Sequence, residues 1–402
     1  MAHTMTGALT DLKVLDLTSV VVGPICTWRL AQYGARVIKV EAPTGDLMRK
    51  LGGGSPTGEH SGTYLHMNRG KRNVALDLAN PASRAIVDRL LAWADVVVSN
   101  MRPQALRRLG LDAETVRARH PAIIHCLITG YGSDGPYAGL PAYDSVVQGA
   151  AGLSGLFLAR DGTPAYVPLL LCDHVVGEIA AGAILAAALR ARTTRDGASI
   201  EVPMFETMAA FVLQEHLGRS SFEPPLGPVG DERLLNANNR PLRTADGWIC
   251  IATNTDSQTR AFLTAAGRRD LAEDPRFATV SERARNVDAW FEVRSSLLAG
   301  RPTAEWLIVL AEADVPAMPC HTPDTLTGDP HLTAVGLVKS EDHPTEGRVL
   351  GIRSSIAIDG SKLSSGHPAH PKGWDTRDVM QEIGFASDEI AALRDAGAVM
   401  TR

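Results

Sequence analysis

The first half of the chain alternates short apolar runs with segments of helical periodicity. Apolar runs typical of buried strands lie at residues 13–17, 36–40, 73–78, 96–99 and 122–128. Helical patterns separate them, at residues 25–33 and from Pro81 to Trp93, where the proline occupies the first helical turn. Strands that alternate with helices of about ten to fifteen residues indicate a parallel sheet covered on both faces. We therefore predict the α/β class for this part of the chain.

The pattern changes after residue 206. A strand and a helix are predicted within residues 199–216, and residues 223–230 then hold three prolines and two glycines, which is typical of a linker. Beyond it we predict a hairpin over residues 243–253 with its turn at Asp246-Gly247. The predicted organisation is a large domain at 1–206, a linker at 207–235, a small domain at 236–325, a linker at 326–350, and a segment at 351–402 that completes the large domain.

Composition narrows the class of protein. The 402-residue chain has a formal net charge of −5, and only 5% of its residues are aromatic, so neither a nucleic-acid binder nor a membrane-surface binder is expected. The five cysteines are scattered, without metal-ligand spacing, as in a reduced cytoplasmic protein. The first seven residues lack the apolar run of a signal peptide. The longest apolar stretch, at 179–189, is shorter than the roughly twenty residues of a membrane span.

Common nucleotide-binding and hydrolase motifs are missing from the sequence. The strand at 13–17 is followed by one glycine rather than GxGxxG, and no phosphate loop or GxSxG elbow occurs. Polar segments instead lie at predicted strand ends, at residues 19–24, 68–73, 99–103 and 129–137. Three of them follow a strand, where open α/β sheets bind ligands, and 68–73 comes just before one. The cations within 68–73 suit a polyanionic ligand, and they equally suit a solvated turn.

Eight segments follow one another along nearly the whole chain: LDLTSVVVGPICTWRLAQYGARVIKVEAPTGDLMR, NRGKRNVALDL, ADVVVSNMRP, ITGYGSDGPYAGLPAYDSVVQGAAGL, DGASIEVPMFETM, TADGWICIA, VPAMPCHTPDTLTGDPHL and DTRDVMQEIGFASDEIAALRDAGAV. In this order they resemble the family III CoA-transferases, a group that includes formyl-CoA transferase, carnitine CoA-transferase and the α-methylacyl-CoA racemases. The resemblance implies a Rossmann-like parallel sheet in the large domain, a smaller α+β domain and an interlocked homodimer. It also implies acyl-CoA and a carboxylic acid acceptor as partners.

The resemblance implies that Asp173, in LLLCDHVVGEIAAG, is a nucleophile. A carboxylate that attacks a thioester forms a mixed anhydride and expels CoA thiolate. In the family, the thiolate then forms an enzyme–CoA thioester on the aspartate. Asp173 also precedes a helical run at 174–190, where aspartate is common as a helix N-cap without any catalytic role. The two roles are compatible, because a helix N-terminus favours an ionised carboxylate.

The resemblance further implies a set of CoA contacts, which are Val20, Leu76, Asn100, Met101, Arg108 and Tyr131, with Arg72 as a phosphate partner. Three of them (Val20, Leu76 and Met101) are apolar and suit a core equally well. Residues 236–243 lack the glycine run of oxalate-using members, so formate and oxalate are not the expected acids. CoA or acyl-CoA is expected as a substrate, with no permanently bound cofactor and no metal.

Two further activities stay open on the same scaffold. Racemases of this group place a histidine directly before an aspartate, and here that position is Tyr143, before Asp144. A phenol with an ordinary pKa near 10 is a poor general base at neutral pH, so a 2-methylacyl-CoA racemase or epimerase is the second hypothesis. The third is a catalytically silent CoA-binding protein. The donor and acceptor acids do not follow from the sequence.

Overall fold

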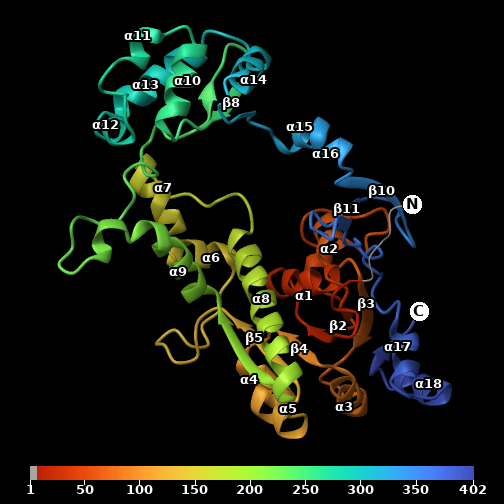
Figure 1. Cartoon of the computed structure of the whole chain (residues 1–402). Coiled ribbons are helices and arrows are strands. Elements are labelled where there is room, and N and C mark those ends of the chain that lie inside the picture. Colours follow the sequence, from red (N-terminus) through yellow and green to blue (C-terminus); the bar gives the residue numbers. More distant parts are fainter. Residues whose placement is uncertain (1–6) are drawn as a thin grey trace. The chain divides into compact units, whose positions relative to one another are not determined.

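The structure is a computed structural model that describes residues 7–402. Most of the N-terminal segment examined for a signal peptide lies outside the described residues. Contacts divide the chain into two compact units (Figure 1). The first unit comprises residues up to 153, 166–212 and 331–402, and the second comprises 154–165 and 213–330. The functional domain limits given above stay a prediction.

The first unit is built on a seven-stranded sheet with the order β14-β3-β2-β1-β4-β5-β6. Its strands are β1 (Lys13–Leu17), β2 (Arg36–Glu41), β3 (Lys71–Leu76), β4 (Val96–Ser99), β5 (Ile124–Thr129), β6 (Ala198–Pro203) and β14 (Val399–Met400). Strands β1 to β6 pair in parallel, which confirms the predicted parallel sheet. The short strand β14 pairs antiparallel with β3 and was not predicted.

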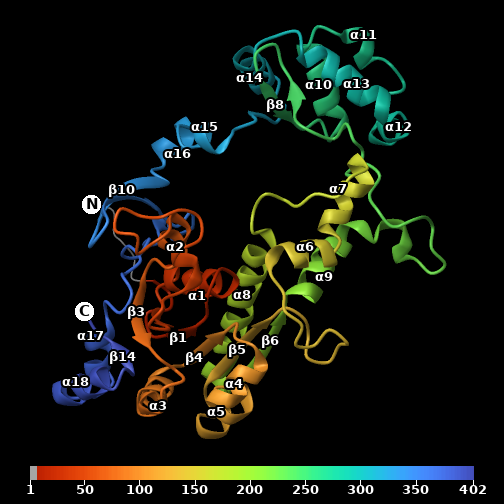
Figure 2. The same cartoon turned by 180° about the vertical axis from the view of Figure 1, so that it is seen from behind.

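Helices cover the sheet on both faces because alternate strand residues are apolar on each side. Leu15, Ile38 and Val97 pack in one buried cluster with residues of α3, α4, α5, α17 and α18. Helices α1 and α8 pack together and contact the strands (Figure 2). The helices of this unit are α1 (Val22–Gln32), α2 (Gly62–Met67), α3 (Arg84–Trp93), α4 (Pro103–Leu109), α5 (Ala113–Arg119), α6 (Asp144–Ala150), α8 (Leu171–Thr194), α9 (Met204–His216), α17 (Thr376–Glu382) and α18 (Ser387–Asp395).

Helix α8 corrects one sequence expectation. It has 24 residues and is, within the described chain, the one helix that is long and apolar enough to cross a membrane by length and composition. The apolar stretch at residues 179–189 therefore underestimated the length of this helix. A helix in a protein core passes the same test. Here α8 packs against α1, β5 and β6, and Glu178 on α8 accepts a 2.6 Å ion pair from Arg29 on α1.

The three cations at the start of β3 do not form a solvated turn. Lys71 is 1% exposed, and its ammonium lies 3.1 Å from Asp16 Oδ2. Arg69 is buried and pairs with Glu341. Arg72 donates to Glu382 at 2.6 Å. Each cation therefore has an internal carboxylate partner, so the solvated-turn interpretation is wrong, and the binding of a polyanionic ligand by this cluster stays a prediction.

The second unit is a small α+β assembly. Strands β7 (Leu242–Arg243) and β8 (Trp248–Ile251) form the predicted antiparallel hairpin, and β9 (Ala317–Pro319) joins β8. Phe262, Trp290 and Trp306 pack in its core. Its helices are α7 (Leu153–Asp161), α10 (Asp256–Ala265), α11 (Arg269–Ala272), α12 (Val280–Arg285), α13 (Val287–Leu298), α14 (Thr303–Glu312) and α15 (Pro323–Leu326).

The chain returns to the first unit at residue 331. The elements from there to α17 are α16 (Pro330–Ala334), β10 (Val338–His343), β11 (Gly347–Ile352), β12 (Ala357–Ile358) and β13 (Ser361–Lys362).

Loss of Lys71 should destabilise the first unit strongly. Lys71→Met leaves the carboxylate of Asp16, which is fully buried, without one of its cations. Breaking a buried ion pair from one side costs about 3–5 kcal/mol, and we expect a loss of that size in urea-induced unfolding. Arg117→Met is the control, because Arg117 and Asp196 are 31% and 65% exposed and such surface pairs contribute about 1 kcal/mol or less. Equal losses for both variants would contradict the structural role of Lys71.

Candidate active site

A cavity of about 400 Å³ opens where four parallel strands end. Residues 19–22 follow β1, residues 100–107 follow β4, residues 130–143 follow β5, and Met204 follows β6. Parallel strands bring their carboxyl ends to one edge of the sheet, which is where α/β proteins bind ligands. Asp173, in the first turn of α8, also lines this cavity.

The structure brings five of the eight residues implied by the resemblance to this one cavity. They are Val20, Asn100, Met101, Tyr131 and Asp173. The structure does not bring the other three there. Leu76 is fully buried in the core under α3, Arg72 is paired with Glu382, and Arg108 lines a separate cavity of about 170 Å³. The CoA-binding roles of all seven residues other than Asp173 stay predictions.

The loop after β1 has an unusual backbone. Val20 has φ of +68°, a left-handed conformation that is a true outlier for a β-branched residue. Its N–H donates to Asp46 Oδ1 at 3.1 Å. Ser19 is held on the other side, because its N–H donates to Asn100 Oδ1 and its carbonyl accepts from Asn100 Nδ2, at 3.0 and 2.8 Å. These contacts fix one wall of the cavity in a strained shape.

Asp173 is 7% exposed. Helix α8 begins at Leu171, and its N-cap is Leu170, so the alternative that Asp173 is merely the N-cap is wrong. The backbone N–H of Asp173 donates to Asp144 Oδ2 at 3.1 Å. Burial, and then the negative charge of Asp144, raise the pKa of Asp173 to about 7. This carboxyl group therefore changes its charge near neutral pH, unlike an ordinary aspartate.

Two cations of the same cavity are not among the CoA contacts that the resemblance implies, although Arg102 lies in the polar segment 99–103 that follows a predicted strand. Arg102 and Arg107 line it together with Asp173, whereas the predicted Arg108 does not. Adjacent residues on a helix point about 100° apart, so on α4 the phase of the helix decides which arginine faces the cavity. That phase follows from the packing of Leu106, which is 1% exposed. The pattern of apolar positions along α4 is the sequence signal that would have indicated that Arg107 faces the cavity.

Tyr143 and Glu201 are two further polar side chains of this cavity. Both line the cavity, and Tyr143 is 64% exposed. Over the described part of the chain, no group of three or more His, Cys, Asp or Glu side chains is arranged to hold a metal ion. The site is therefore built from one buried carboxyl group, two arginines and polar loop atoms.

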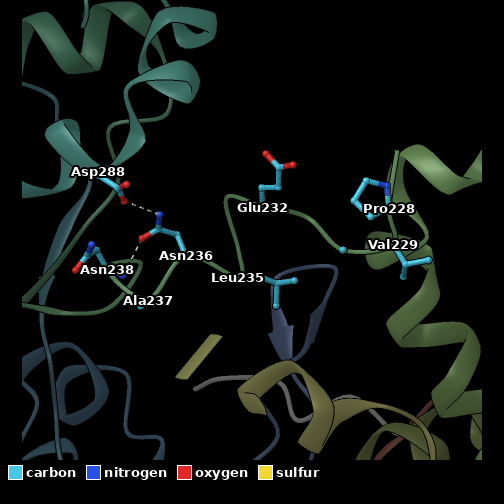
Figure 3. A pocket seen from close by; sticks show the side chains of 9 residues that line it. Pro228, Val229, Glu232, Leu235, Asn236, Ala237, Asn238 and Asp288 are labelled. Atoms are coloured by element: carbon cyan, nitrogen blue, oxygen red, sulfur yellow. Dashed lines mark hydrogen bonds between the residues drawn. The ribbon is translucent and has the colours of Figure 1, made fainter. Parts of the chain in front are cut away.

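A second cavity, of about 440 Å³, lies within the second unit (Figure 3). Its lining consists of residues 228–230, Glu232 and Leu235 of the predicted linker, residues 236–238 of the predicted small domain, and Asp288 of α13, which accepts a 3.2 Å hydrogen bond from Asn236. The described residues that line it include the acids Glu232 and Asp288 and no Lys, Arg or His. This lining disfavours the phosphates of an anionic ligand.

Comparisons with known proteins agree with this architecture. The family model of CoA-transferase family III matches residues 9–376. A succinate–glutarate CoA-transferase of Agrobacterium fabrum is 33% identical over 93% of this chain and 95% of its own length. An acetyl-CoA:oxalate CoA-transferase of Acetobacter aceti is 33% identical over 78% of this chain and 80% of its own.

The solved structure of a CAIB/BAIF family protein from Brucella suis is also similar. It superposes with a TM-score of 0.80 at 29% identity, and covers 94% of this chain and all of its own. The mixed α/β fold with a largely parallel sheet is thus shared with proteins of known structure. The resemblance stated from sequence motifs is confirmed, and the chain belongs to CoA-transferase family III, a family of enzymes.

Proposed function

We propose that the chain is an acyl-CoA:carboxylate CoA-transferase with Asp173 as its nucleophile. The observation that carries this proposal is the position of Asp173, a buried carboxyl group that lines the cavity at the carboxyl ends of the strands. A nucleophile that forms an anhydride must be shielded from water, because water would hydrolyse the intermediate. Relatives named as CoA-transferases act on several different acids, among them succinate, glutarate and oxalate, so the acid pair stays open.

The reaction proceeds in four balanced steps. The Asp173 carboxylate attacks the thioester carbonyl of the donor acyl-CoA, which forms a mixed anhydride and releases CoA thiolate. The thiolate attacks the aspartyl carbonyl, which forms an aspartyl-CoA thioester and releases the donor acid. The acceptor carboxylate attacks this thioester to give a second anhydride and CoA thiolate. Attack of the thiolate on the acceptor acyl carbon yields the new acyl-CoA and frees Asp173.

The cavity offers two cations to the negatively charged CoA. Arg102 and Arg107 lie in the segment after β4. Arg69 and Arg72 each form an ion pair with a carboxylate, whereas no carboxylate in the described part of the chain forms one with Arg102 or Arg107. Guanidinium groups bind phosphate oxygens in bidentate fashion. We propose that they contact the CoA phosphates, while Tyr131 and Met101 line the path of the pantetheine arm.

We also propose the homodimer implied by the resemblance. Large apolar side chains stay exposed on the described chain. Leu189 of α8 is 69% exposed, Phe211 of α9 is 46% exposed, and Phe222 and Leu226 of the predicted linker are 56% and 58% exposed. Exposed apolar surface of this kind is typical of a protein interface, which supports coverage by a second copy.

A racemase is the second candidate function, and one observation favours it. A carboxyl group with a pKa of about 7 suits general acid–base catalysis at neutral pH. The position directly before Asp144, where racemases of this group place a histidine, holds Tyr143, which lines the cavity. Incubation with a chiral 2-methylacyl-CoA in deuterium oxide separates the two functions. A racemase incorporates deuterium next to the thioester, whereas a transferase turns over only when an acceptor acid is present.

Asp173→Ala should abolish transfer. In the proposed mechanism no other group can form the covalent intermediate, so we expect a loss of at least about 10⁴-fold in kcat. Mass spectrometry of the wild type, incubated with succinyl-CoA and without acceptor, should show CoA attached to Asp173 and its conversion to a hydroxamate by hydroxylamine. Unchanged turnover in Asp173→Ala, or an adduct on another residue, would refute the nucleophile. A silent CoA-binding protein would show no turnover even in the wild type.

Acylation of Asp173 should depend on pH near neutrality. The attacking species is the carboxylate, and its pKa is raised to about 7. The single-turnover rate should therefore be constant above about pH 8 and fall about tenfold per pH unit below pH 6. Rapid-quench measurement of the CoA adduct between pH 5 and 9 tests this. A rate that stays constant down to pH 5 would mean that the carboxyl group titrates as an ordinary aspartate.

The matched pair Arg107→Ala and Arg108→Ala tests which arginine binds CoA. Arg107 lines the cavity of Asp173 and Arg108 lines the other one. We expect Arg107→Ala to raise KM for acyl-CoA about tenfold or more, since one charge-assisted phosphate contact contributes about 1.5–3 kcal/mol. Arg108→Ala should leave KM within twofold. The reverse result would support the assignment implied by the family resemblance instead.

A further inference from the structure

Two side chains of α6 hold the segment that leads to Asp173. Gln148 lies one helical turn after Asp144, and its Nε2 donates to Asp144 Oδ1 at 2.6 Å and to the Leu169 carbonyl at 3.1 Å. Gln148 Oε1 accepts from the N–H of Val167 at 2.9 Å. Asp144 Oδ2 accepts from the N–H of Asp173 at 3.1 Å. The pair therefore clamps both ends of the segment 167–173.

The charge of Asp144 is more than this clamp needs. Asp144 is 5% exposed and Gln148 is 2% exposed. In the part of the chain that the structure describes, no cation forms an ion pair with Asp144, so hydrogen bonds alone hold its carboxylate, and burying a carboxylate without a counter-charge costs free energy. A neutral acceptor could receive the N–H of Asp173 without that cost. A buried charge next to the proposed nucleophile points to a role in its chemistry.

We propose that Asp144, held in place by Gln148, is a positioning residue that orients Asp173 and sets a negative charge against its carboxylate. This inference rests on the proposed function. When Asp173 is acylated, as anhydride or thioester, it carries no charge. Repulsion from Asp144 therefore raises the free energy of the free carboxylate and leaves the acylated states nearly unaffected. The charge favours attack on the thioester and a larger equilibrium fraction of covalent enzyme.

The other titratable groups around Asp173 do not cancel this repulsion. Burial lowers the pKa of His174 and raises that of Cys172 to about 12, so both neighbours on α8 are neutral at pH 7. Glu178, one turn further along α8, is paired with Arg29 of α1. The remaining charged or titratable groups that line the same cavity are Arg102, Arg107, Tyr131, Tyr143 and Glu201, and none of them is among the causes that shift the pKa of Asp173, which are burial and Asp144.

Asp144→Asn removes the charge and keeps an amide oxygen that can accept the N–H of Asp173. With succinyl-CoA as donor, we expect the acid limb of the single-turnover acylation rate to move down by about one pH unit. At pH 8, without acceptor acid, the equilibrium fraction of CoA-bound enzyme should fall several-fold. Asp88→Asn is the control, because it makes the same change in net charge at a 43% exposed side chain of α3 and should change neither measurement.

Gln148→Leu tests the orienting part separately. It keeps the charge of Asp144 and removes the side-chain hydrogen bonds of Gln148, so we expect kcat to fall about tenfold with the acid limb in its wild-type position. Thermal unfolding monitors folding of each variant. The proposal is overturned if folded Asp144→Asn keeps the wild-type acid limb, or if Gln148→Leu alone shifts it. Should Asp144→Asn not fold, Asp144→Ser removes the same charge, and a wild-type acid limb in that variant overturns the proposal.

Different results would contradict the role of Asp173 and the role of Asp144. If Asp173 is not the nucleophile, the wild type forms no CoA adduct on it, and the proposed function falls. If Asp173 is the nucleophile but Asp144 plays no part in its chemistry, the wild type forms the adduct and the pH profiles of wild type and Asp144→Asn coincide.

Discussion

The buried ammonium of Lys39 holds the loop on which the cavity depends. Lys39 is 1% exposed, and its Nζ donates to the carbonyl of Thr18 at 2.8 Å and pairs with Asp46 at 3.0 Å. Asp46 in turn accepts from the N–H of Val20. A β-branched residue at positive φ costs about 1–3 kcal/mol, and it persists because charge-assisted bonds on both sides require that conformation. One wall of the cavity is thus set by two buried charges, Lys39 and Asp46, that do not line it.

Buried and cavity-facing cations of this protein differ in where their strands place them. Lys71 lies at the amino end of β3, and its ammonium forms an ion pair with the buried carboxylate of Asp16. Arg102 and Arg107 follow the carboxyl end of β4 and face the cavity. The segment 68–73 begins before β3 and ends within it. The rule that ligands bind beyond the carboxyl ends of strands therefore distinguishes it from the other three polar segments, which follow their strands.

Local pattern predicted the fold well and the site in part. Five apolar runs lie on β1 to β5, and Asp246-Gly247 forms the turn of the β7–β8 hairpin. The two-residue strand β14 is too short for any periodic signal, and it is recruited by β3 from more than three hundred residues away. The contact between Asp144 and Asp173 likewise joins residues 29 apart. Such pairs depend on how α6 and α8 pack, which sequence spacing does not encode.

Burial has two effects on Asp173 that oppose each other in the proposed chemistry: it excludes water, and it raises the pKa of the carboxyl group. Water must be excluded, because the anhydride and the thioester lose their energy on hydrolysis. The same exclusion disfavours the charged form and raises the pKa to about 7, so only part of the enzyme is ionised at neutral pH. In the proposed mechanism the ionised fraction is more reactive, because the buried carboxylate is poorly solvated and faces the charge of Asp144. A more exposed aspartate would be fully ionised, yet better solvated and open to water, so partial ionisation is the physical consequence of protecting the intermediate.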